Sequence, residues 1–191
     1  MSKNKKRPWD EKWEVIAKIG KGGQGETSLV KPKNDSFPPG NYVLKILNYC
    51  HQKDDERRAR MSREVNNLKT FRNPGIPELI DSNYEFFEDL NILLYMVTEF
   101  IEGNTLEKFI IEKGGIDVFD AVKFTVKLLD IVEYCHQRDV VHRDIKPDNI
   151  IVRNDSLTTP VLIDFGLSFN KEDDTNLTPT GQDVGNRFLF L

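Results

Sequence analysis

The chain contains a polar segment, residues 142–149, that brings three different functional groups within six positions of one another. These groups are a carboxylate, an ammonium group and an amide, on Asp144, Lys146 and Asn149. Two short apolar runs follow, at 150–152 and 161–163, and a second carboxylate, Asp164, comes directly after them. Apolar runs separated by polar turn residues predict a small β-hairpin. The fold must therefore present Asp164 at the end of a hairpin that begins next to the polar segment.

The chemistry of these groups indicates a site that handles phosphate. They supply a proton acceptor, a positive charge and two oxygen ligands for a hard cation. Phosphoryl transfer needs these parts, because its catalysis is mostly positioning and charge neutralisation.

The bulk composition is that of an ordinary soluble globular protein. The 191 residues are 38% hydrophobic and 30% charged, with a net charge of −4. Nothing in this balance indicates a nucleic-acid partner or an anionic membrane. The two cysteines have no metal-ligand or redox spacing, and the apolar run at 92–97 is too short to span a bilayer. We therefore expect a cytoplasmic protein with a flexible tail over residues 1–12.

The chain changes character near residue 100. The first part predicts mainly short strands and one amphipathic helix: strands at 13–19, 28–31, 42–47, 84–87 and 91–100, and the helix at 53–71. The second part predicts two helices, at 105–111 and 118–137, capped by Thr105 and Asp117. The longer helix has an apolar stripe: Val118, Val122, Val126, Leu129 and Val132. This segregation favours an α+β fold.

Residues 142–149 and the D-F-G tripeptide at 164–166 resemble the catalytic motifs of protein kinases. The resemblance implies a bilobal fold, with a complete β-rich N-lobe at 13–100 and a partial helical C-lobe at 101–191. It also implies ATP and Mg²⁺ as cofactors and a protein substrate. Asp144 would be the catalytic base, Lys146 would neutralise charge on the transferred group, and Asn149 and Asp164 would hold Mg²⁺. Asp144 followed two positions later by Lys146 is similar to the serine/threonine class.

The first part of the chain also resembles the nucleotide-binding half of that family. Residues 20–25 match G-x-G-x-x-G, which is either a simple tight turn or a phosphate-binding lid. The residues around these glycines resemble bacterial members. Lys45 ends an apolar strand, and the resemblance pairs it with Glu64 on the charged helix. The other residues implied in nucleotide binding are Ile19, Gly20, Gly22, Gly23, Gly25, Thr27, Val43, Thr98, Glu99, Ile101 and Ile151.

Three further expectations concern the segment after D-F-G. Arg143 would pair with a phosphorylated loop threonine, the candidates being Thr175, Thr178 and Thr180. The family continues into an A-P-E anchor and further helices, whereas this sequence stops at 185–191. We therefore expect a truncated or split kinase whose long helix is partly uncovered, with a second chain completing the C-lobe. The alternatives are an ATP-binding but inactive pseudokinase and a small-molecule phosphotransferase.

Overall fold

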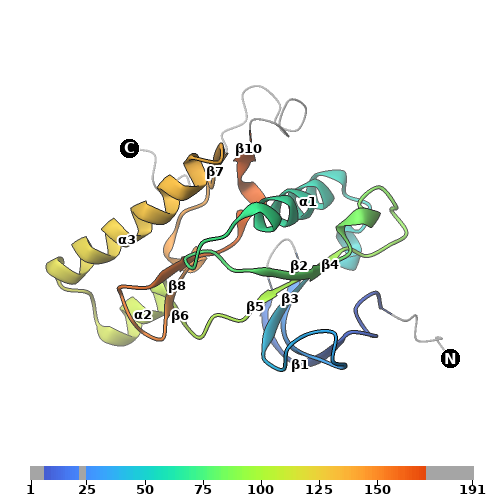
Figure 1. Ribbon diagram of the computed structural model, residues 1–191, viewed down its shortest axis with the longest axis horizontal. Coiled ribbons are helices and arrows are strands. Elements are labelled where there is room, and N and C mark those ends of the chain that lie inside the picture. The colour runs from blue at the N-terminus through green and yellow to red at the C-terminus, as the bar shows by residue number, and fades with distance from the viewer. Residues whose placement is uncertain (1–6, 22–24, 171–191) are drawn as a thin grey trace. The chain divides into compact units, whose positions relative to one another are not determined.

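The computed structural model describes residues 7–21 and 25–170, which form two compact units (Figure 1). Unit 1 comprises Met1–Val65 and Glu78–Phe100, and unit 2 comprises Asn66–Pro77 and Ile101–Leu191. Strands dominate the first unit and helices the second, so the predicted α+β class is confirmed. Among the described residues, no helix combines the length and apolar character that a membrane span requires.

Unit 1 is built on a five-stranded antiparallel sheet with the strand order β1-β2-β3-β5-β4. The strands are β1 (Trp13–Lys21), β2 (Gly25–Pro32), β3 (Tyr42–Leu47), β4 (Leu79–Ser82) and β5 (Tyr95–Glu99). Side chains alternate between the two faces of a sheet. One face carries Val30, Leu44 and Val97, each at most 1% exposed, and it forms the core of this unit. The opposite face is left for the functional side chains.

The segment before β1 covers the core face of the sheet. Trp9 is 1% exposed and packs edge-on against Tyr95, with 5.9 Å between the ring centroids. Asp81 of β4 accepts hydrogen bonds from Lys12 Nζ at 2.9 Å, Trp13 Nε1 at 2.8 Å and the Tyr95 hydroxyl at 2.9 Å. Burial and the neighbouring Asp81 raise the pKa of Tyr95, so its hydroxyl remains a donor. The part of the expected flexible tail from Trp9 onward thus belongs to the core.

The helix α1 (Asp55–Thr70) is fixed to a loop of unit 1 by the buried Arg58, which is 1% exposed. Its guanidinium donates hydrogen bonds to the backbone carbonyls of five residues: Gln52, Phe86, Phe87, Asp89 and Ile92. The strand predicted at 84–87 is wrong. Tyr84–Phe86 is the short 3₁₀ helix η2, and a second one, η1 (Tyr49–His51), precedes α1. Carbonyls that turn toward one guanidinium are not available for a strand ladder.

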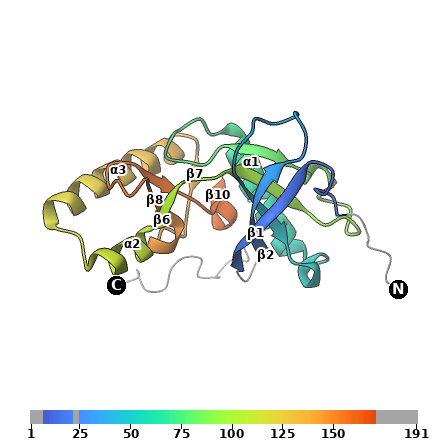
Figure 2. The same cartoon turned by 90° about the horizontal axis from the view of Figure 1, so that it is seen from below.

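Unit 2 combines two helices with short strands and turns. The elements are β6 (Gly103–Thr105), α2 (Leu106–Lys113), α3 (Val118–His136), β7 (Val140–Val141), η3 (Pro147–Asn149), β8 (Ile150–Arg153), β9 (Pro160–Leu162), η4 (Phe165–Leu167) and β10 (Phe169–Asn170). The predicted hairpin is confirmed as the antiparallel pair β8–β9. The predicted caps are also confirmed: Thr105 accepts from Lys108 N, and Asp117 from Phe119 N and Asp120 N. Figure 2 shows α2 beside β6 and β8.

The buried side of α3 differs from the predicted stripe. Its buried residues are Phe124, Ile131 and Cys135. The stripe residues Val118, Val122, Val126 and Leu129 are between 50 and 81% exposed. Ile131 lies against Gly75, where a Cβ atom would come within 2.4 Å of Ile131 Cδ1. The contact that seats α3 therefore comes from a distant loop, which helical periodicity does not show.

We expect Arg58→Met to lower the free energy of unfolding by about 3 kcal/mol or more, because buried carbonyls lose their donors while the side-chain volume is kept. Urea unfolding followed by tryptophan fluorescence measures the change, since Trp9 and Trp13 are both buried in unit 1. The matched control is Arg60→Met in the same helix, which removes a solvent-accessible pair with Glu56 and should cost less than about 1 kcal/mol. Equal losses in the two variants would contradict the anchoring role of Arg58.

Candidate active site

The candidate site of unit 2 is organised around His142, a residue that is 2% exposed. Its Nε2 lies 3.0 Å from the carbonyl oxygen of Ile163, and its Nδ1 accepts the backbone N–H of Asp144 at 3.3 Å. These contacts assign the proton to Nε2 in a neutral ring. Burial lowers the pKa of His142, which agrees with this state. The imidazole thus joins the loop that bears Asp144 to the residue before Asp164.

Asp144 is held at one of its two carboxylate oxygens. Oδ2 accepts from Lys146 Nζ at 2.9 Å and from Asn149 Nδ2 at 2.8 Å. The amide of Asn149 also donates to the backbone carbonyl of Asp144 at 2.9 Å. The hydrogen bond that Lys146 donates to Asp144 raises the pKa of Lys146, so the ammonium group stays charged. The three groups predicted from one segment therefore form one cluster, ordered by the turn η3.

The bonds in this cluster leave specific atoms open to a ligand. Within the described residues, Asp144 Oδ1 accepts no hydrogen bond, and the carboxylate is 14% exposed. Both side-chain hydrogen bonds of Asn149 are donated by Nδ2, so its Oδ1 also has no donor among these residues. One free carboxylate oxygen and one free amide oxygen therefore lie in the same loop.

Asp164 begins the turn η4 with a backbone conformation that non-glycine residues seldom adopt, at φ 64° and ψ 75°. Its Oδ1 accepts the N–H of Gly166 at 3.4 Å. Phe165 is fully buried and packs between two rings, with centroid distances of 4.7 Å to His142 and 5.2 Å to Phe71. This packing holds the turn that carries Asp164. The contact with Phe71 was not predicted, because nothing in the sequence links residues so far apart.

Two more expectations concern the residues around this cluster and the segment after it. Arg143 has a φ of 65°, and its guanidinium lies 4.2 Å from the ring centroid of Phe169. The threonines proposed as its phosphorylated partners (Thr175, Thr178 and Thr180) and the segment 185–191 lie outside the described residues.

A hydrogen bond with Asp148 raises the pKa of Glu107 on α2, so two carboxyl groups lie close together beside the loop.

In unit 1, the structure pairs Lys45 with Glu64 as predicted from the resemblance. Lys45 Nζ and Glu64 Oε2 are 2.6 Å apart, with side-chain exposures of 17 and 4%. Lys45 comes from β3 and Glu64 from α1. The bond is short and largely desolvated, so Glu64 holds the Lys45 ammonium group in a fixed position on this face of the sheet.

Strand register places several of the other predicted nucleotide-binding residues on the face that carries Lys45. Thr27 is directly opposite Lys45, and Val43 is directly opposite Thr98. Directly paired residues share a face, and residues two apart on one strand also share it. Thr27, Val43, Lys45 and Thr98 therefore form a small patch away from the core of unit 1.

The glycine motif has two kinds of glycine. A Cβ atom at Gly25 would lie 1.8 Å from the backbone oxygen of Ile46, so the close approach of β2 to β3 requires glycine there. A Cβ atom at Gly20 would lie 3.6 Å from Thr27 Cβ and 3.9 Å from Thr27 Oγ1, which are ordinary contacts. Packing therefore explains why residue 25 is a glycine, but it does not explain why residue 20 is one. Gly22 and Gly23 lie outside the described residues.

The remaining predicted residues lie at the ends of elements. Ile19 on β1 is 49% exposed, and Glu99 ends β5, where its N–H donates to the Glu78 carbonyl at 3.0 Å. In unit 2, Ile101 is buried, and Ile151 on β8 pairs with Val161. No ligand contact tests these four residues, so their roles stay predictions.

The oxygen donors of unit 2 fit a magnesium ion. The amide oxygen of Asn149 has no donor among the described residues, and Asp164 adds a carboxylate. Mg²⁺ usually takes one or two protein oxygens and completes its shell with water and phosphate. The described residues contain no cluster of three or more acidic, histidine or cysteine side chains that could form an all-protein cage.

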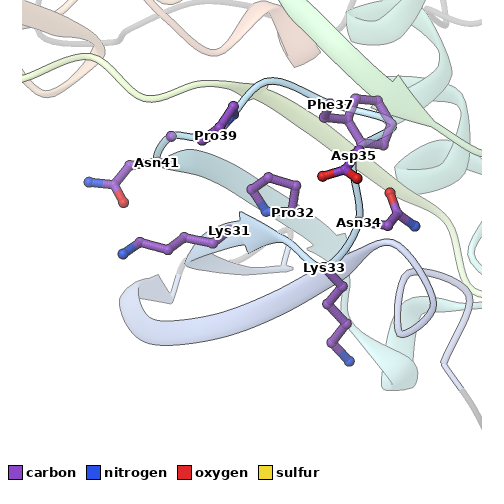
Figure 3. A pocket seen from close by; sticks show the side chains of 9 residues that line it. Lys31, Pro32, Lys33, Asn34, Asp35, Phe37, Pro39 and Asn41 are labelled. Carbon is purple, nitrogen blue, oxygen red and sulfur yellow. The ribbon is translucent and has the colours of Figure 1, made fainter.

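A separate hollow of about 550 Å³ lies on the turn between β2 and β3 (Figure 3). It is lined by Lys31, Pro32, Lys33, Asn34, Asp35, Phe37, Pro39, Gly40 and Asn41. None of these residues belongs to the predicted site.

Comparison with known proteins agrees with this geometry. Residues 13–185 match the protein kinase domain family. Calcium-dependent protein kinase 4 of Plasmodium berghei is 33% identical over 166 residues, which cover 86% of this chain and 30% of that protein. Serine/threonine-protein kinase PknA of a Nostoc strain is 36% identical over 165 residues, covering 82% of this chain and 28% of that protein.

The loop of Asp144 and Lys146 is joined through His142 to the D-F-G turn, and all of these residues lie within the matched range. The chain belongs to the protein kinase domain family. Members of this family use ATP and Mg²⁺ generally. The chain spans less than a third of the length of the two relatives described above.

We expect the free energy of unfolding to fall as the pH is lowered below about 6.5. The folded-state pKa of His142 is depressed, so the unfolded chain binds a proton that the folded chain resists. The contribution is at most about 1.4 kcal/mol per pH unit. Urea unfolding by circular dichroism between pH 5 and 8 measures the slope. His142→Asn should flatten it, whereas His136→Asn, at an exposed position, should not. A wild-type slope in His142→Asn would refute this origin.

Proposed function

We propose that this chain transfers the γ-phosphoryl group of ATP to serine or threonine hydroxyls of protein substrates. The observation that carries the proposal is the state of the Asp144 carboxylate. Lys146 and Asn149 fix one oxygen, and the other accepts no hydrogen bond among the described residues. A carboxylate held in this way is oriented to receive a proton from a hydroxyl group.

In the proposed reaction, Asp144 Oδ1 accepts the hydrogen of the substrate hydroxyl. The hydroxyl oxygen forms a bond to the γ-phosphorus of ATP, and the bond from that phosphorus to the bridging oxygen of ADP breaks. The proton passes to Asp144, and ADP leaves with the electron pair of the broken bond. The Lys146 ammonium group would neutralise negative charge on the transferred group, and its hydrogen bond to Asp144 keeps it charged and in position.

The metal would be held by Asn149 Oδ1 and the Asp164 carboxylate, both oxygen donors of the kind that Mg²⁺ prefers. When bound, Mg²⁺ neutralises charge on the phosphate oxygens. Asn149 also donates to Asp144, so one side chain would connect the base to the metal.

The nucleotide would be held by residues of the Lys45 face. Lys45, oriented by Glu64, would bind the α- and β-phosphates, and the backbone of the glycine motif would approach them from Gly20 onward. Within unit 1, adenine would contact Ile19, Thr27 and Val43, with Thr98 behind it. The contact with Ile151 of unit 2 stays a prediction from the resemblance. The backbones of Glu99 and Ile101 would hydrogen-bond the base.

The serine/threonine class rests on Lys146, which follows Asp144 by two positions. Tyrosine kinases instead use an R-D-L-A-A-R-N type of loop. The printed name of the Nostoc relative also places that protein in the serine/threonine class. These two observations support the hydroxyl of serine or threonine as the acceptor.

We expect Asp144→Asn to lower the turnover number for phosphate transfer by about 10²- to 10⁴-fold while Mg²⁺·ATP binding persists, because the amide orients like the acid but accepts no proton. Transfer from radiolabelled ATP to a serine- and threonine-containing peptide library measures turnover, and thermal shift measures binding. Asp155→Asn, at an exposed turn residue, is the control that should keep wild-type rates.

Three results would overturn the proposal. Mg²⁺·ATP binding without transfer in the wild-type chain indicates an inactive nucleotide-binding module. Transfer to a small metabolite and not to peptide indicates a small-molecule phosphotransferase. Phosphotyrosine as the labelled product would contradict the acceptor class.

A further inference from the structure

Unit 2 contains a buried polar contact that the proposed mechanism does not use. Asn67 in the last turns of α1 is 2% exposed, and Ser168 just after η4 is fully buried. Asn67 Nδ2 donates to Ser168 Oγ at 2.7 Å. The same hydroxyl donates to the carbonyl oxygen of Phe165 at 2.6 Å. A short relay of hydrogen bonds therefore runs from the helix to the backbone of the D-F-G turn.

This contact is not required for packing alone. The neighbouring helix residues Val65 and Leu68 are apolar and buried, so an apolar side chain at position 67 would suit the same environment. Burying an amide costs free energy unless it is hydrogen-bonded. Ser168 supplies an acceptor for Asn67, and the relay keeps its own hydroxyl hydrogen satisfied. The Asn67 amide thus has an acceptor and the Ser168 hydroxyl has both a donor and an acceptor. This indicates a specific link between two residues that are 101 positions apart in the sequence.

The link acts on the turn that presents Asp164. Ser168 closes η4 through both of its groups, since its N–H also donates to the Phe165 carbonyl, at 3.1 Å. Asp164 starts the same turn in the left-handed region. Such a conformation persists only where the surroundings hold it. The rings of His142 and Phe71 hold the side chain of Phe165, and Ser168 holds its carbonyl.

We propose that Asn67 is a positioning residue that fixes the D-F-G turn through Ser168 and so keeps Asp164 oriented for the metal. The statement about the metal rests on the proposed function, whereas the statement about the turn does not. Asn67 touches neither substrate nor metal in this scheme. Its effect passes through the hydroxyl of Ser168 to the carbonyl of Phe165.

The first test measures the turn without reference to activity. Asn67→Leu keeps a similar volume and removes the donor, and Ser168→Ala removes the relay. Hydrogen exchange of the peptide covering 164–170 should accelerate roughly five- to tenfold in both variants. Asn66→Leu, at the preceding and half-buried position, should exchange like wild type. The double variant should exchange like Ser168→Ala alone, because both substitutions remove the same Asn67–Ser168 hydrogen bond.

Two outcomes of this test overturn the link. One is wild-type exchange in both single variants, and the other is an additive increase in the double variant. If Asn67→Leu does not fold, Ser168→Ala removes a single oxygen and decides the question by itself.

The second test asks whether the turn serves the metal. The Mg²⁺ concentration that gives half-maximal phosphate transfer should rise about three- to tenfold in Asn67→Leu and Ser168→Ala, with the maximal rate recovered in excess Mg²⁺. Because Mg²⁺ binding would also stabilise a partly unfolded variant, the comparison is made at a temperature at which circular dichroism shows each variant fully folded without Mg²⁺. An unchanged Mg²⁺ requirement overturns the positioning role. A wild-type chain without any transfer overturns the proposed function instead, and the exchange measurement still decides the link.

Discussion

The site of unit 2 depends on the neutral imidazole of His142. A neutral ring has one donor and one acceptor, and here the donor meets the Ile163 carbonyl while the acceptor meets the Asp144 N–H. Protonation would turn the acceptor into a second donor facing another donor. Burial, which lowers the pKa of His142, therefore protects the arrangement on which both acidic motifs rely. The packing of Phe165 against the same ring adds the third connection.

Ion pairs at the site are better explained by chemistry than by stability. Lys45 with Glu64 is largely removed from water, and Lys146 with Asp144 is partly so. Desolvation offsets much of the attraction in such pairs, so apolar residues of similar volume would often stabilise a fold as well. In the proposed function, both lysines contact phosphate groups. Two partly buried pairs on different elements are consistent with that role.

Local patterns in the sequence predicted the parts of the structure that local interactions determine. The caps at Thr105 and Asp117 and the hairpin of β8 and β9 depend on residues close in sequence, and the structure has them where expected. Contacts across the chain were not predictable in this way. The segment at 84–87 has strand-like composition, yet Arg58 draws its carbonyls into a turn. Periodicity likewise identified an apolar stripe on α3, but it did not predict that the side carrying Ile131 would be the buried one.

The helix α1 shows how distant polar contacts set the position of an element that its own sequence leaves open. Its buried apolar residues, such as Val65 and Leu68, favour burial of one side but tolerate small shifts along the axis. Hydrogen bonds do not, because they weaken steeply with distance and angle. Arg58 bonds near the start of α1, Glu64 in its middle and Asn67 near its end. Within unit 1, the directional contacts of Arg58 and Glu64 therefore determine where the Glu64 carboxylate meets Lys45. Within unit 2, the contact of Asn67 joins the end of the helix to Ser168.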